Sequence, residues 1–276
     1  MSEEKALLKV ENLKISFPNE GELSQVVHGI SYQVFPNEIV GIVGESGSGK
    51  SVSTLAVLGL LSENALVKGK ISFLQKNILL NSPQEWQQLR GNEISMIFQE
   101  PMSSLNPTIT CGKQVAEILQ IHTKLSSREI KAEVLRLFEK VKLPTPEQTF
   151  KKYPHEISGG QMQRVMIAMA IACKPKILIA DEPTTALDVT VQKEIILLLK
   201  ELQAEYGMSV LFISHDLSLV HEIADRIAVM YKGKVVEMGT PEQLFNNAQE
   251  TYTQALIAAR PDTEIRLKRL PTISDF

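Results

Sequence analysis

The fold is decided by an eight-residue stretch in the first fifth of the chain, Gly44-Glu45-Ser46-Gly47-Ser48-Gly49-Lys50-Ser51. The segment from Glu38 to Val43, apolar from Ile39 onward, precedes it and, after the Pro36-Asn37 turn, reads as a buried parallel strand. The residues from Ser51 to Leu61 read as a helix that opens directly after the loop. Strand, loop and helix in this order are the setting that the motif G-x-x-x-x-G-K-[ST] requires. The sequence therefore predicts a loop that binds phosphate.

The residue types of the loop suit that chemistry. Glycines let consecutive backbone N–H groups curl around phosphate oxygens, and the helix N-terminus adds a favourable partial charge. We expect Lys50 to reach the β- and γ-phosphates of a nucleotide and the Ser51 hydroxyl to bind Mg²⁺. The residues predicted to contact the nucleotide here are Gly44, Ser46, Gly47, Ser48, Gly49, Lys50, Ser51 and Val52.

A pair of carboxylates follows a second apolar strand, Ile177 to Ala180. Acidic residues at a strand end are often only solvated, but this pair accompanies a phosphate loop in the same chain. We expect Asp181 to hold Mg²⁺ directly or through water, as the Walker-B aspartate does. Glu182, one residue further along, is then placed to orient or deprotonate the attacking water.

A third motif, Ile157-Ser158-Gly159-Gly160-Gln161, lies a short helix upstream of the carboxylate pair. With the phosphate loop, it makes the chain resemble the nucleotide-binding subunit of an ABC transporter from about Leu8 to Pro261. Ile157 stands where the family usually has Leu, which conserves volume. The resemblance implies ATP hydrolysis by a two-subunit sandwich, in which the signature residues Ser158, Gly159, Gly160 and Gln161 serve the ATP held by the partner subunit.

The resemblance also assigns roles to residues outside these motifs. It implies that Gln99 touches Mg²⁺ and senses the membrane partner, and that Asp188 belongs to the D-loop Ala186-Leu187-Asp188. His215, which follows the apolar strand Val210 to Ile213, matches the histidine that contacts the γ-phosphate. Phe17 stands where the family stacks an aromatic ring on adenine, although a packed core residue is the alternative at this position.

The expected fold class is α/β: a P-loop NTPase core with an antiparallel β subdomain and an inserted α-helical subdomain, the ABC ATPase fold. Residues 6–35 alternate like antiparallel strands, and residues 39–98 read as alternating buried strands and helices of the core. Residues 177–237 return to that alternation, and residues 240–260 read as a helical appendix. The ABC ATPase domain is expected over residues 6–260, with a tail or linker over residues 261–276.

The helical subdomain is expected over about residues 107–172. Its readable helices run from Val115 to His122 and from Ser127 to Val141, the second one opened by the capping-box pair Ser126 and Glu129. Three prolines are expected to break the chain before the signature helix, which begins near Ser158: Pro144, Pro146 and Pro154.

The composition limits which kinds of partner the protein can have. The formal net charge is -3, so a nucleic-acid partner gains no electrostatic support, and no apolar run approaches the ~18 residues of a membrane span. The resemblance implies a peripheral protein at the cytoplasmic face of the cell membrane. Its expected partners are a second ATP-binding subunit, identical or different, two membrane permease subunits and, indirectly, a solute-binding protein.

Three segments resemble the dipeptide/oligopeptide importer branch, which also includes nickel importers: Met96 to Pro107, Pro241 to Phe245 and Tyr252 to Ala259. Relatives commonly have His-Pro before the Tyr-Thr, where this chain has Glu250-Thr251. An importer of nickel or another small solute, and a soluble ABC ATPase acting on nucleic acid or ribosomes, share the catalytic motifs and stay open as alternatives. The sequence does not identify the solute, nor whether the chain is half of a tandem fusion.

Overall fold

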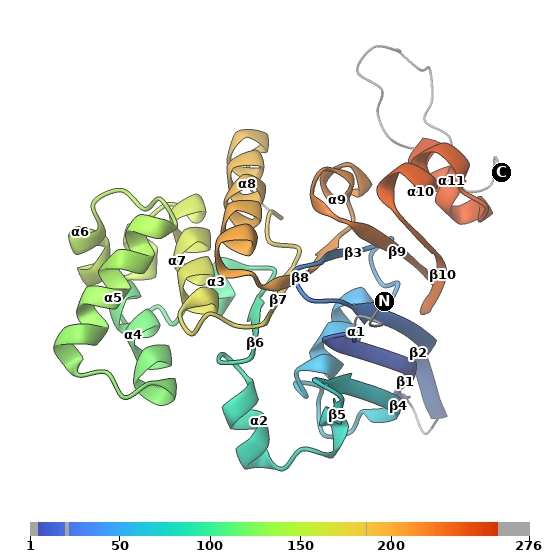
Figure 1. The fold of residues 1–276 in the computed structure, drawn as a ribbon, viewed down its shortest axis with the longest axis horizontal. Helices are drawn as coiled ribbons and strands as arrows, with labels where there is room; N and C mark the ends of the chain where they lie inside the picture. Colours follow the sequence, from blue (N-terminus) through green and yellow to red (C-terminus); the bar gives the residue numbers. More distant parts are fainter. Residues whose placement is uncertain (1–4, 20–21, 186, 259–276) are drawn as a thin grey trace. The chain divides into compact units, whose positions relative to one another are not determined.

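The computed structural model describes residues 5–19, 22–185 and 187–258 (Figure 1). The chain divides into two compact units, the first made of Met1–Asn81 with Leu211–Phe276 and the second of Ser82–Val210. The expected tail 261–276, the D-loop residue Ala186 and the Glu20-Gly21 pair lie outside the described residues. Among the residues described, no helix is both long enough and apolar enough to cross a membrane.

The first unit contains a four-stranded antiparallel sheet in the order β2-β1-β4-β5. Its strands are β1 (Leu8–Asn19), β2 (Glu22–Val34), β4 (Leu66–Phe73) and β5 (Lys76–Asn77). Leu8 on β1 lies opposite Val34 on one side and Phe73 on the other, and all three are buried. The antiparallel region expected over residues 6–35 is confirmed, because β1 and β2 form it.

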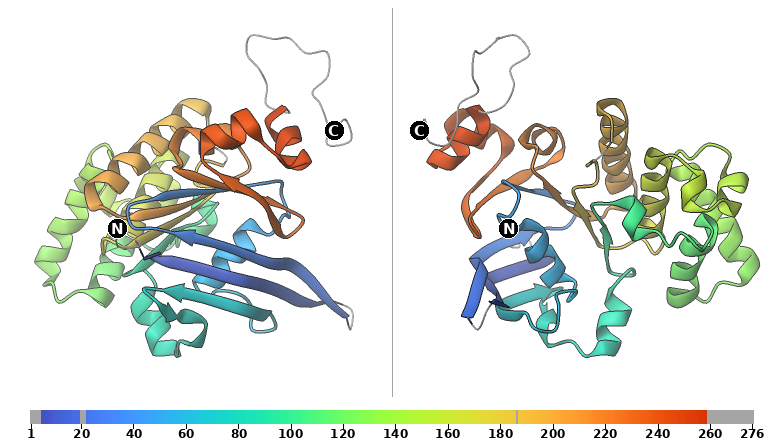
Figure 2. Two further views of the ribbon diagram at one scale, coloured as in Figure 1. Left: turned by 45° about the vertical axis from the view of Figure 1, so that its right-hand side comes forward. Right: turned by 180° about the vertical axis from the view of Figure 1, so that it is seen from behind.

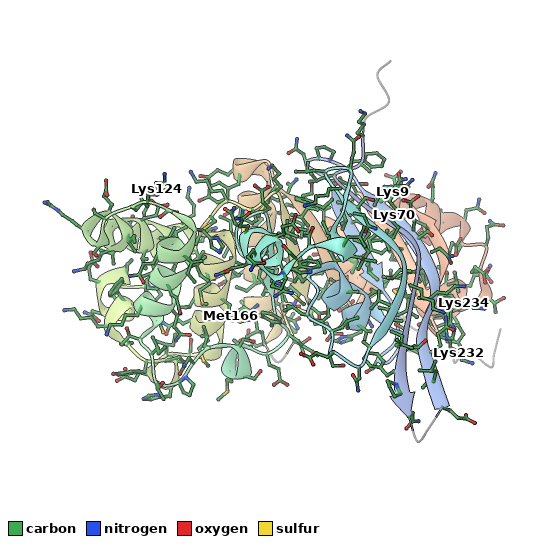
Figure 3. The ribbon with its side chains drawn as sticks, turned by 90° about the horizontal axis from the view of Figure 1, so that it is seen from below. Lys9, Lys70, Lys124, Met166, Lys232 and Lys234 are labelled. Atoms are coloured by element: carbon green, nitrogen blue, oxygen red, sulfur yellow. The ribbon has the colours of Figure 1, made fainter. Side chains whose placement is uncertain are left out.

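The assignment of all of residues 39–98 to the α/β core was wrong, because β4 and β5 belong to this antiparallel sheet. Only the end of β4 is buried, and its first five residues are at least partly exposed, as on a sheet with one solvated face. On that exposed face Lys9 and Lys70 project from neighbouring strands (Figure 3). Their ammonium groups lie 2.7 and 3.9 Å from the carboxylate of Glu11.

The first unit also holds strands in the order β10-β9-β3-β8. Strand β3 (Ile39–Val43) is buried throughout and runs parallel to β9 (Arg226–Tyr231), which pairs antiparallel with β10 (Lys234–Gly239). The boundary between the two units falls within β8 (Ser209–Ser214). The helical elements of this unit are α1 (Lys50–Val57), η1 (Ile78–Leu80), α9 (Leu217–Ile223), α10 (Pro241–Asn247) and α11 (Thr251–Ala258).

Helix α1 is shorter than expected, since it ends at Val57 and not at Leu61. Gly59 follows with a φ of +59°, a left-handed conformation that commonly stops a helix. The helical appendix expected over residues 240–260 is confirmed as far as residue 258 by α10 and α11, which lie side by side in Figures 1 and 2, and its last two residues lie outside the described range.

The second unit combines two parallel strands with helices, and its share of the strand order is β8-β7-β6. Strand β6 (Ile94–Ile97) runs parallel to β7 (Ile177–Asp181), with Ile97 opposite Ala180. The helical elements are α2 (Pro83–Leu89), α3 (Pro101–Ser104), α4 (Cys111–His122), α5 (Ser127–Lys140), α6 (Pro146–Lys151), η2 (Pro154–Glu156), α7 (Gly159–Ile171) and α8 (Val189–Tyr206). Helices α4 to α7 pack together (Figure 1) around apolar side chains such as Val115, Val134 and Phe138.

The starts of these helices follow local sequence signals. Ser126 and Glu129 form the predicted capping box of α5. Helix α4 begins at Cys111, four residues before the expected start, after Thr110 in extended conformation. Pro146 and Pro154 do more than break the chain, because each occupies the first turn of a short helix, where its missing N–H costs nothing.

Candidate functional site

The phosphate loop of the first unit lies between β3 and α1, as predicted. Its conformation depends on glycine: Gly49 has a φ of +96°, and a Cβ atom on Gly44 would lie 2.0 Å from the carbonyl oxygen of Met230. Ser46 and Gly47 are exposed at the tip, Ser48 is buried, and Ser51 and Val52 are half-buried in the first turn of α1. The loop therefore presents exposed backbone at its tip above a tightly packed base.

Lys50 turns back over this loop. Its side chain is buried at 4% exposure, and Nζ donates hydrogen bonds to the carbonyl oxygens of Gly44 at 2.7 Å and Glu45 at 2.8 Å. The buried Ser48 hydroxyl has no hydrogen-bond partner among the described residues. A cation held inside a glycine-rich loop, with an unsatisfied hydroxyl beside it, is a donor set that fits phosphate oxygens.

Two contacts from the C-terminal part of the first unit support the loop. The backbone N–H of Gly233, in the β9–β10 turn, donates to the Ser48 carbonyl oxygen at 3.1 Å. The N–H of Glu45 donates to the hydroxyl of Tyr252 on α11 at 3.0 Å. The sequence predicted neither contact, because both join residues that are far apart in the chain. Tyr252 was placed only in a segment that resembles one transporter branch.

Two other predicted residues also lie in the first unit. Phe17 is half-buried near the end of β1, where its backbone faces Ser24 of β2. His215 is exposed directly after β8, and the next residue, Asp216, accepts N–H bonds from Ser218 and Leu219 and so caps α9. The histidine is thus held at the junction of a buried strand and a capped helix.

The second unit brings three predicted residues together at one strand edge. Because β6 and β7 are parallel, Gln99, which follows β6, and the Asp181-Glu182 pair, at the end of β7, lie at the same carboxyl edge of the strands. Gln99 Nε2 donates to Glu182 Oε2 at 3.1 Å, and Thr185 Oγ1 donates to the same oxygen at 2.9 Å. Asp181 is 5% exposed. Thr185 was not predicted, because its role depends on the bend after the strand.

Glu182 has a φ of +45°, a left-handed conformation that is unfavourable for a side chain of this kind. Strained backbone that is held by its surroundings concentrates at functional sites. The observed conformation therefore favours the interpretation that Glu182 is a functional residue over the interpretation that it is only a solvated residue at a strand end.

The signature motif forms the start of α7, a 13-residue helix. Ser158 Oγ accepts the Gln161 N–H at 3.3 Å, and Gln161 Oε1 accepts the Ser158 N–H at 3.1 Å, which is a capping box. Ser158 and Gly159 are exposed, and a Cβ atom on Gly160 would lie 3.1 Å from Val191 of α8. The exposed helix start can accept an anion.

Asp188 forms a similar start for α8, since its Oδ1 accepts the N–H groups of Thr190 at 3.1 Å and Val191 at 3.0 Å. In the part of the chain that the structure describes, no group of three or more His, Cys, Asp or Glu could hold a metal ion by itself. Ser51, Gln99 and Asp181 offer hydroxyl, amide and carboxylate oxygens. These are donors that suit Mg²⁺, which takes its remaining ligands from phosphate and water.

The fold and these motifs define the class of the ATP-binding cassettes. The sequence model described as "ABC transporter" matches residues 27–185. A dimeric ATP-binding cassette, MJ0796, solved in a post-hydrolysis state bound to ADP and Pi, superposes with a TM-score of 0.76 at 28% identity, covering 85% of this chain and 98% of the other. The chain therefore belongs to the ABC transporter family and is one of its ATPase subunits.

Curated relatives extend this result along the chain. The "Peptidoglycan transport ATP-binding protein YejF" of Agrobacterium fabrum is 50% identical over 94% of this chain. The "Dipeptide transport ATP-binding protein DppD" of Bacillus subtilis is 45% identical over 97% of it. The chain spans 48% of the length of the first relative and 80% of the second.

Proposed function

We propose that this chain is the ATP-hydrolysing subunit of an importer for dipeptides or oligopeptides. The observation that carries the proposal is the 45% identity to a dipeptide transport ATP-binding protein along 97% of this chain. In this proposal the chain binds at the cytoplasmic face of the membrane to two permease subunits, pairs with a second ATP-binding subunit, and receives peptide through a solute-binding protein.

We assign the binding of the nucleotide and its metal ion to two groups of residues. The backbone N–H groups of residues 44–52 and the Lys50 ammonium hold the phosphates, and Phe17 stacks on adenine. Ser51, Gln99 and Asp181 would hold Mg²⁺, which would supply positive charge to neutralise the phosphates. Support comes from the donor-lined loop and from the shared strand edge of Gln99 and Asp181.

We assign the chemical step to Glu182 and His215. Glu182 accepts the proton of the attacking water while Gln99 and Thr185 hold its carboxylate in place. His215 donates a hydrogen bond to the γ-phosphate. Both residues follow buried strands, which gives each a rigid base.

The signature helix acts on the ATP of the partner subunit. Ser158, Gly159, Gly160 and Gln161 present the exposed N-terminus of α7, whose N–H groups and partial positive charge attract the γ-phosphate across a two-fold interface. Asp188 lies at the start of α8 and faces the same interface. Binding of ATP closes the dimer, and loss of the γ-phosphate opens it.

Uptake by reconstituted vesicles tests the proposal. The subunit is assembled with two candidate permease subunits and a solute-binding protein, and ATP-driven uptake of a labelled dipeptide and of ⁶³Ni²⁺ is measured. We expect peptide uptake, and none with the Glu182→Gln subunit. Uptake of nickel alone, or ATPase activity stimulated by nucleic acid without permeases, would contradict it.

A further inference from the structure

Helix α11 contacts the phosphate loop through one side chain. The hydroxyl of Tyr252 accepts the backbone N–H of Glu45 at 3.0 Å, although the two residues are 207 positions apart. Tyr252 is 5% exposed, and its ring stacks on Tyr231 with centroids 4.1 Å apart. The contact is therefore made by a side chain that packing holds in a fixed orientation.

The Glu45 N–H belongs to the same peptide group as the Gly44 carbonyl, which accepts a hydrogen bond from Lys50 Nζ at 2.7 Å. In a trans peptide the N–H and the C=O point in opposite directions, and no cis peptide bond occurs among the described residues. One peptide group is thus held from both sides, by the Tyr252 hydroxyl and by the Lys50 ammonium. A rotation of this peptide would remove the Gly44 oxygen from Lys50.

The start of α11 is itself fixed to the sheet. The carboxylate of Glu237 on β10 accepts the N–H of Gln249 at 2.7 Å and that of Glu250 at 3.3 Å, in the residues that lead into α11. Tyr231, at the end of β9, supports the ring of Tyr252. The hydroxyl therefore has a defined position relative to β9 and β10.

We propose that Tyr252 is a positioning residue of the phosphate loop: its hydroxyl fixes the Gly44–Glu45 peptide, which keeps Lys50 in place, and so raises the affinity for a nucleoside triphosphate. This inference rests on the proposed phosphate-binding role of the loop. Tyr252 acts through the peptide and touches no reacting group. Its effect is therefore on binding, and the turnover of bound ATP is left nearly unchanged.

The test is Tyr252→Phe in the full chain, which keeps the stacked ring and removes the acceptor. We expect the dissociation constant and the KM for Mg·ATP to rise roughly fivefold, as for the loss of one net hydrogen bond, with kcat altered less than about twofold. Tyr231→Phe is the matched control, since it removes a hydroxyl from the other ring of the same stack. The Glu45 N–H is bound by the Tyr252 oxygen, which the control variant keeps.

Two further readouts separate the outcomes. If Tyr252 only stabilises α11, Tyr252→Phe lowers the melting temperature without nucleotide and leaves the affinity unchanged, which overturns the inference. Equal weakening by both Phe variants also overturns it. Failure of the proposed function gives a different result. If the loop does not bind phosphate, Lys50→Ala binds Mg·ATP as tightly as the unmodified chain.

Discussion

Gln99 Nε2 donates a hydrogen bond to Glu182 Oε2 across 3.1 Å, joining the ends of two parallel strands in the second unit. The amide that is proposed to face Mg²⁺ through its oxygen thus holds the proposed general base through its nitrogen. Loss of Gln99 from this position would therefore remove a hydrogen bond that holds the carboxylate, alongside the one from Thr185.

Replacing Glu182 with Gln separates binding from chemistry. The amide keeps the shape of the carboxylate but cannot accept a proton from water, so we expect hydrolysis to fall about 10²–10⁴-fold while ATP still binds. Phosphate release and nucleotide titration measure the two effects. Glu201→Gln, at an exposed carboxylate that pairs with Lys142, is the control. Near-normal turnover by Glu182→Gln would show that Glu182 is not the catalytic carboxylate and is only a solvated residue at a strand end.

Replacing Thr185 with Val removes the second donor to Glu182. We expect kcat to fall about fivefold, as for one hydrogen bond, with the KM for ATP nearly unchanged, because Thr185 holds only the carboxylate. Thr185→Ser keeps a hydroxyl and serves as the control. Steady-state kinetics in which the Ser variant is as slow as the Val variant would exclude a role for this hydrogen bond.

Replacing Lys50 with Ala removes the buried cation and leaves the carbonyl oxygens of Gly44 and Glu45 without its hydrogen bonds. We expect ATPase activity to fall at least about a hundredfold, in line with the loss of an electrostatic contact to the transferred group, and ATP binding to be lost. Lys14→Ala, on an exposed position of β1, should have no effect on either measurement. Equal affinity in both variants would contradict the assignment of the loop.

Replacing Ser158 with Arg tests the sharing of sites between subunits. The variant should bind ATP yet not hydrolyse it, because the serine serves the nucleotide of the opposite subunit. Ser126→Arg removes an equivalent helix cap on α5, so it controls for the ~1 kcal/mol that a cap contributes to stability.

Mixing sharpens this test. A heterodimer of the Ser158→Arg and Lys50→Ala subunits contains one intact site, formed by the loop of the first and the signature of the second. We expect ATPase activity to reappear on mixing. Failure to recover it, when heterodimers are shown to form by mass measurement, would mean that the sites are not shared or that both must act together.

Features that depend on neighbouring residues could be predicted from the sequence. The Ser126–Glu129 box sets the start of α5 because both partners lie within one turn. The all-apolar run of β3 indicated a strand buried on both faces. The phosphate loop has its glycines where a side chain would collide with Met230 or strain the backbone.

Apart from the ends of helices such as α1 and α4, the errors concern pairings between distant segments. Strand β4 was assigned to the α/β core because its pattern is compatible with any half-buried strand, and only its register with β1, such as Val10 opposite Ile71, places it in the antiparallel sheet. The Tyr252 contact was missed for the same reason, since nothing near Glu45 indicates which side chain its N–H will find.

The first unit is assembled from both ends of the sequence, and this affects the order in which a nascent chain can mature. The phosphate loop leaves the ribosome early, but β3 must wait for its partner strand β9, in which Arg226 lies opposite Val40. The second unit is continuous and can fold in between, since domains generally fold as units during synthesis. The phosphate loop makes its contacts with Met230, Gly233 and Tyr252 only late in synthesis, when these residues have been added. A translation product that stops at residue 210 therefore carries the complete glycine-rich motif without the residues that shape it.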